Sequence, residues 1–109
     1  MNEIHYSHDS SNDLVEIEKY ICDELANQSA AKKTVKKITE KIRLLEKFAE
    51  LGSPLASIID LETDYRFLVC DNYLVFYRID GKNIFILRVI YGGREYLAIL
   101  FKDQGNHGS

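Results

Sequence analysis

Three strand-like segments follow one another in the second half of the chain, and they constrain its fold more than any other feature. They cover residues 65–70 (YRFLVC), 73–79 (YLVFYRI) and 84–91 (IFILRVIY). Asp71-Asn72 lies between the first two and Asp80-Gly81 follows the second. An Asp-Gly pair between apolar segments is a strong signal for a β-hairpin. The segments are apolar at neighbouring positions, so both faces of the predicted antiparallel sheet need a covering layer.

Two helical patterns in the first half of the chain supply one such layer. Residues 3–7 alternate and predict a short first strand. A helix with one apolar stripe is predicted from the spacing of Leu14, Ile17, Ile21 and Leu25. A second helix, starting near Ala30, is predicted from the seam of Ala31, Val35, Ile38, Ile42, Leu45 and Ala49. The two seams suit an antiparallel helix hairpin.

The predicted fold class is therefore α+β, in the order β-α-α-β-β-β, with the helix hairpin packed on one face of an antiparallel sheet. At 109 residues the chain is expected to form one domain, assigned here to residues 1–102. Residues 94–101 follow a Gly-Gly pair and are predicted to cover the other face, as either a helix or a strand. Residues 103–109 are expected to be a frayed tail.

Composition and charge exclude several classes. The N-terminus lacks the basic and apolar regions of a signal peptide, and no apolar run approaches the roughly 20 residues of a membrane span. A soluble cytoplasmic protein without membrane contact is expected. Cys22 and Cys70 are far apart and fit no metal-binding spacing, so they are expected to be buried, reduced thiols and no metal is predicted. No cofactor is predicted either.

The net charge of −3 hides an uneven distribution. Residues 1–29 hold seven acids and one base, whereas residues 30–47 hold seven bases and two acids, a local charge of +5. This basic stripe on the second helix is either a solvated helix face or a docking surface for an acidic partner. For the docking alternative, the predicted contact residues are Lys33, Lys37 and Lys41.

Arginines interrupt all three apolar strands, at Arg66, Arg78 and Arg88. A buried charge is costly unless it is paired, so each arginine must meet a carboxylate or reach an open face. Strand alternation places Arg88 opposite to Phe85, Leu87 and Val89. If these three pack under the helices, Arg88 shares the other face with Arg66, and clustered guanidinium groups there suit a phosphate or carboxylate. The alternative is structural pairing with Asp64, Glu62 or Glu95.

Several segments resemble the RelE/ParE superfamily of bacterial toxins from type II toxin–antitoxin systems. They are DLVEIEKYICDEL, FAELGSPL and the long stretch DYRFLVCDNYLVFYRIDGKNIFILRVIYGGREYLAILF. The most specific pieces are YRxLVxxNYLVFYR and ILRVxxGxREY. The resemblance covers nearly the whole chain and implies a strand, a helix hairpin and a curved antiparallel sheet, in agreement with the predicted order.

The resemblance implies two toxin mechanisms. RelE-like members cleave messenger RNA in the ribosome, and ParE-like members inhibit DNA gyrase. If this chain is an endoribonuclease, the predicted catalytic residues are Arg66, Arg88, Tyr91 and Tyr96. The predicted phosphate-binding residues are Arg66, Arg88 and Arg94. A further alternative is an inactive member that only binds its antitoxin and co-represses transcription.

Two departures favour the ParE-like mechanism. Many superfamily members carry histidine where this chain has Tyr91, and RelE-like nucleases tend to carry lysines where PLASIIDLETD has none. A negative net charge is also unsuited to the dense phosphate of a ribosome. The resemblance further implies a cognate antitoxin, expected to be acidic and to fold on binding, contact with operator DNA only through that antitoxin, and a possible homodimer.

Overall fold

A computed structural model describes residues 1–93 and 95–101. The helices are α1 (His8–Glu24), α2 (Gln28–Arg43) and α3 (Tyr96–Leu100), with 3₁₀ turns at Leu44–Glu46 and Leu55–Ser57. The strands are β1 (Glu3–Tyr6), β2 (Ser53–Pro54), β3 (Arg66–Cys70), β4 (Tyr73–Asp80) and β5 (Asn83–Tyr91). The predicted order of elements is confirmed, with the short strand β2 added between α2 and β3, and residues 96–100 form a helix. Arg94 and the predicted tail lie outside the described residues.

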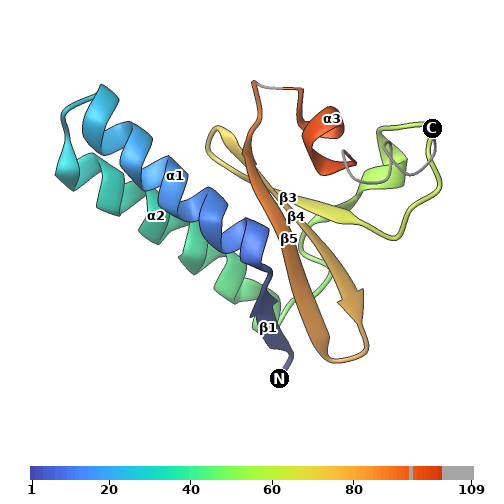
Figure 1. Ribbon diagram of the computed structural model, residues 1–109. Helices are drawn as coiled ribbons and strands as arrows, with labels where there is room; N and C mark the ends of the chain where they lie inside the picture. Colours follow the sequence, from blue (N-terminus) through green and yellow to red (C-terminus); the bar gives the residue numbers. More distant parts are fainter. Residues whose placement is uncertain (94, 102–109) are drawn as a thin grey trace.

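The five strands form one sheet in the order β1-β5-β4-β3-β2. Three of the four pairings are antiparallel, but β1 pairs with β5 in parallel, so the sheet is mixed rather than wholly antiparallel. A parallel pair needs a long connection between its strands, and here the chain from α1 to β4 supplies it. Figure 1 shows this hairpin on one side of the sheet and α3 on the other.

Local signals explain the helix boundaries. Ser7 caps α1 by accepting a hydrogen bond from the Ser10 N–H at 3.0 Å, and Asn27 caps α2 through the Ala30 N–H at 3.0 Å. The predicted helix to Ala49 is too long, because α2 ends at Arg43 and tightens into a 3₁₀ turn. Leu45 in that turn is nonetheless fully buried, as its place in the seam predicts.

Two apolar clusters lie on opposite faces of the sheet. The helix-facing cluster joins α2 residues to the sheet and includes Ile38, Ile42, Val75, Tyr77 and Ile86. The outer cluster is built on Leu55, Phe76 and Ile90 and is covered by residues of α3, among them Tyr96, Ile99 and Leu100. Both faces of the meander are therefore covered, as its continuous apolar sequence predicts.

A β-bulge changes the alternation along β5. Phe76 pairs with Arg88 but Tyr77 pairs with Ile86, so Leu87 is an extra residue. Before the bulge, Ile84 and Ile86 belong to the helix-facing cluster; after it, Val89 does. The expectation that Phe85 and Leu87 pack under the helices is therefore wrong, because it assumed unbroken alternation.

Candidate functional site

Arg88 forms a bidentate ion pair with Asp13 of α1. Its Nε donates to Asp13 Oδ2 at 2.8 Å, and its Nη2 donates to Asp13 Oδ1 at 2.9 Å. Asp13 Oδ2 also accepts from the Val89 N–H at 2.8 Å. The two side chains are only 27% and 14% exposed. Asp13 therefore joins α1 to β5 just beyond the end of β1, and Arg88 takes the structural role of a paired strand arginine.

Arg66 lies on the other face of the sheet. It pairs across the strands with Tyr77, which belongs to the helix-facing cluster, whereas Arg88 pairs with Phe76 in the outer cluster. The Arg66 Nη2 donates to the carbonyl oxygens of Gly52 and Glu50, at 2.6 and 3.3 Å. The prediction that Arg66 and Arg88 share one face is wrong, because the bulge moves Arg88 to the opposite side.

The predicted nuclease residues divide between the same two faces. Tyr91 pairs with Tyr73 on the helix-facing side, and their rings meet edge to face at 5.8 Å. Tyr96 lies on the outer side, where its ring stacks on Phe76 at 5.7 Å. The strand register thus brings Tyr96 towards Arg88 but places Arg66 and Tyr91 on the other face. Arg94, the third predicted phosphate ligand, lies outside the described residues.

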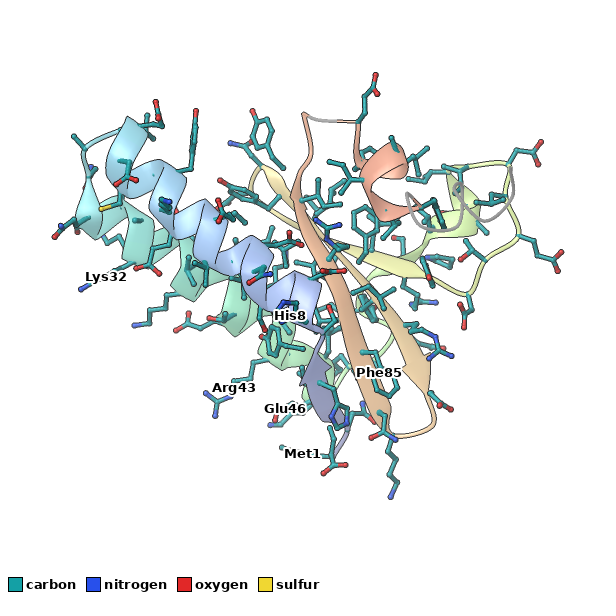
Figure 2. The ribbon with its side chains drawn as sticks, in the orientation of Figure 1. Met1, His8, Lys32, Arg43, Glu46 and Phe85 are labelled. Atoms are coloured by element: carbon teal, nitrogen blue, oxygen red, sulfur yellow. The ribbon has the colours of Figure 1, made fainter. Side chains whose placement is uncertain are left out.

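Arg78 is paired as the structural alternative predicts. Its Nε lies 3.4 Å from Asp64 Oδ2, and its guanidinium carbon lies 5.7 Å from the centre of the Phe85 ring. The ion pair lines an open hollow of about 710 Å³ on the outer face, together with Tyr65 and Phe101. Phe85, labelled in Figure 2, is also stacked on His5 at 5.2 Å. Through these contacts Arg78 links Asp64 to the Phe85 ring on the outer face of the sheet, which is a structural role.

The predicted lysine stripe lies along α2 and ends at the sheet. Lys37 Nζ is 3.3 Å from Asp71 Oδ2 in the β3–β4 turn, and Lys41 Nζ donates to the carbonyl oxygen of Val69. Lys33, one turn earlier, is exposed. Figure 2 shows that Lys32 and Arg43, on another side of the helix, project away from the sheet. The stripe of Lys33, Lys37 and Lys41 therefore leads from solvent to the outer edge of β3.

That edge is open among the described residues. β2 pairs only with Arg66 and Phe67, so the outer side of residues 68–70 has no partner strand in residues 1–93 and 95–101. An open edge presents backbone donors and acceptors that another chain can pair with. Lys41 occupies one of these groups, the Val69 carbonyl.

An apolar strip borders the open edge. The chain meets β3 at two points around this edge: Lys41 of α2 reaches the Val69 carbonyl, and Ser53 of β2 pairs with Phe67. The segment between them follows α2. It exposes three large apolar side chains, and β3 adds a fourth. We call them the β3-edge strip: Leu44 (48% exposed), Phe48 (59%), Leu51 (44%) and Val69 (48%). Large apolar side chains exposed near an unpaired strand edge are typical of protein-binding surfaces.

Comparison with known proteins connects this architecture to a family. A family model for the ParE toxin of type II toxin–antitoxin systems (parDE) matches residues 4–96. The chain belongs to the ParE toxin family. Its function is therefore that of a toxin in a type II toxin–antitoxin module, and the predicted RelE/ParE membership is confirmed on the ParE side.

A solved structure of the chromosomal ParDE TA system from P. aeruginosa supports the same assignment. It matches this ParE-family toxin with a TM-score of 0.70 and 25% sequence identity, over 84% of this chain and 96% of the other. A comparison with curated proteins found no match. The helix hairpin and sheet predicted from sequence are thus the fold of a ParE-like toxin.

Sequence reasoning missed two parts of this site. Asp13 was not among the expected partners of the strand arginines, although its carboxylate pairs with Arg88, 75 residues away. The β3-edge strip was also missed, although Leu44, Phe48 and Leu51 follow a helical spacing of four and three off the main seam. In residues 1–93 and 95–101, no helix is long and apolar enough to cross a membrane.

Proposed function

We propose that this ParE-family toxin arrests growth in the cytoplasm by inhibiting DNA gyrase and that a cognate antitoxin neutralises it. The family match over residues 4–96 carries the proposal, because gyrase inhibition is the ParE-like mechanism. The separation of Arg66 from Arg88 supports it, because a ribonuclease needs phosphate-stabilising groups gathered at one scissile bond.

Expression in cells tests the proposed toxin role. Induction of the toxin alone should stop growth within a few generations, and co-expression of the antitoxin encoded beside it should restore growth. DNA breaks should accumulate before growth stops, because a gyrase poison leaves cleaved DNA. Normal growth of cells that demonstrably accumulate the toxin would instead indicate the inactive, antitoxin-binding member.

The β3-edge strip is the proposed binding site of the antitoxin. The open side of residues 68–70 can accept an extended segment as an additional strand, and apolar side chains of that segment would cover Phe48 and Val69. Lys33, Lys37 and Lys41 lie beside the same edge and suit acidic side chains. This surface offers an open strand edge, exposed apolar side chains and positive charge. An acidic segment with apolar side chains, which becomes ordered on binding, would complement all three.

Charge reversal tests the electrostatic part of this site. Changing Lys33, Lys37 and Lys41 together to glutamate should weaken antitoxin binding roughly thirtyfold, about 2 kcal/mol, because attraction becomes repulsion. Isothermal titration calorimetry at two salt concentrations measures the loss, which should shrink as salt rises.

A matched control carries the same charge change on another side of α2. Lys32, Lys36 and Arg43 changed to glutamate alter the net charge equally, but these residues lie off the stripe. This control should retain most of the affinity. Equal losses in the two triple variants would show that only the overall charge matters and would contradict a docking site along the stripe.

Truncation of Phe48 tests the apolar part. Phe48→Ala should weaken antitoxin binding about tenfold or more, because aromatic anchors contribute most of the affinity of such surfaces. The toxin should stay folded, since the ring is 59% exposed and supports little of the core. Unchanged affinity in the same titration, with an unchanged melting temperature, would remove the β3-edge strip from the antitoxin interface.

A further inference from the structure

A second exposed surface lies where α1 faces the ends of β4 and β5. It begins beside the β3–β4 turn, whose Asp71 is the partner of Lys37. Its centre is Tyr73, whose ring meets that of Tyr91 edge to face at 5.8 Å. Burial is the main cause that raises the pKa of Tyr73, and the nearby Tyr91 and Tyr20 of α1 raise it further. Tyr20 and Tyr91 are 59% and 47% exposed. We call Tyr20, Tyr73 and Tyr91 the tyrosine patch.

Tyr91 and the backbone beside Tyr73 are held in place before any partner binds. The Tyr91 ring lies against the backbone of Gly93, where an added Cβ would overlap the ring. The Gly92 N–H donates to the Asn72 carbonyl oxygen at 2.7 Å, which ties the end of β5 to the turn before Tyr73. Tyrosine side chains fixed in this way lose little conformational entropy on binding, which makes them effective anchors at protein interfaces.

The charges around the patch indicate the kind of partner. Helix α1 contains six acids and one base, and Asp13 is neutralised by Arg88. The other five carboxylates are exposed and make no ion pair with the described residues: Asp9, Glu16, Glu18, Asp23 and Glu24. Glu16 and Glu24 lie one helical turn on either side of Tyr20. A basic protein surface complements this arrangement, because its lysines and arginines can meet both carboxylates and tyrosine rings.

We propose that the tyrosine patch, with the neighbouring carboxylates Glu16, Asp23 and Glu24 of α1, is the surface that docks on the target enzyme, against a basic region of that enzyme. This inference rests on the proposed inhibition of gyrase. An enzyme that binds DNA carries lysines and arginines that neutralise phosphates, and such a region is a complementary partner for α1. The toxin would then use the acidic helix α1 for the target and the basic stripe of α2 for the antitoxin.

Binding of purified toxin variants to DNA gyrase holoenzyme tests the inference. Tyr20→Ala and Tyr91→Ala should each lower gyrase affinity about tenfold or more. Tyr20→Phe and Tyr91→Phe should stay within about threefold of the unaltered toxin, because the ring supplies most of the contact. Gly93→Ala should also weaken binding several-fold, since the new methyl group displaces the Tyr91 ring. Circular dichroism of each variant checks that the fold is retained.

Antitoxin affinity of the same variants separates the two surfaces. Tyr20→Ala and Tyr91→Ala should bind antitoxin as tightly as the unaltered toxin, whereas Phe48→Ala should lose antitoxin affinity and retain gyrase binding. If the tyrosine variants bind gyrase normally while the unaltered toxin is active, the inference is overturned and the proposed function stands. If the tyrosine variants lose antitoxin affinity instead, the patch belongs to the antitoxin interface. If the unaltered toxin does not bind gyrase, both proposals fail.

Discussion

Replacing Arg88 by alanine is expected to destabilise the toxin by up to about 3–5 kcal/mol, because it leaves the part-buried Asp13 carboxylate without its cation. Asp13 is 14% exposed and holds both the Arg88 guanidinium and the Val89 N–H. A loss of this size lowers the melting temperature of a domain of about 100 residues by more than about 10 °C. Thermal denaturation followed by circular dichroism measures it. This result would agree with the structural alternative for the strand arginines, in which each pairs with a carboxylate.

Two further variants make the test specific to the buried pair. Arg78→Ala removes an arginine from the neighbouring strand, but its ion pair with Asp64 is longer and more exposed, at 3.4 Å. That variant should lose no more than about 1 kcal/mol. A double variant, Asp13→Leu with Arg88→Met, removes both charges and should recover part of the stability lost in Arg88→Ala. Equal stability of Arg88→Ala and Arg78→Ala would contradict a structural role for Arg88.

The second large effect is expected at Gly52. A Cβ there would overlap the carbonyl oxygen of Phe67 and lie 2.8 Å from the Tyr77 hydroxyl. That hydroxyl is buried and linked to two backbone groups: it donates to the Ala49 carbonyl at 2.8 Å and accepts from the Gly52 N–H at 3.0 Å. Gly52→Ala should therefore destabilise the toxin by about 3 kcal/mol, through overpacking and loss of these hydrogen bonds.

Tyr77→Phe separates the two causes, because it removes the hydroxyl without adding volume. It should cost about 2 kcal/mol by leaving the Gly52 N–H and Ala49 carbonyl unsatisfied. Gly92→Ala is the matched control, since its nearest neighbour is the Asn72 oxygen at 3.3 Å, and it should cost less than about 1 kcal/mol. Urea denaturation of the three variants gives the comparison. Equal stability of Gly52→Ala and Gly92→Ala would show that the contact at Gly52 is unimportant.

Periodicity predicted most of the fold correctly because the α2 seam is long and strict. Ala31, Ile38, Ile42 and Leu45 were assigned to the core and are all at most 1% exposed. The Asp80-Gly81 hairpin was also predicted, and Gly81 adopts the positive φ of 61° that favours glycine in such a turn. These features depend on neighbouring residues, so a single sequence contains them.

The candidate site was less predictable because it depends on contacts between distant residues. One extra residue, Leu87, reverses which later side chains of β5 face the helices, and no local signal marks it. The predicted shared face of Arg66 and Arg88 failed for this reason. The partner of Arg88 was equally hidden, since Asp13 is 75 residues away and an acid near a helix start is already accounted for by the helix dipole. The open edge of β3 required the strand order, which periodicity does not give.

The central proposal is tested most directly by measuring DNA breaks and messenger RNA cleavage in the same cells. The samples are taken shortly after the toxin is induced without antitoxin. We predict double-strand breaks that depend on gyrase, with messenger RNA left intact. Cleavage of messenger RNA within translated codons, without such breaks, would contradict gyrase inhibition and would identify the toxin as a ribosome-dependent nuclease.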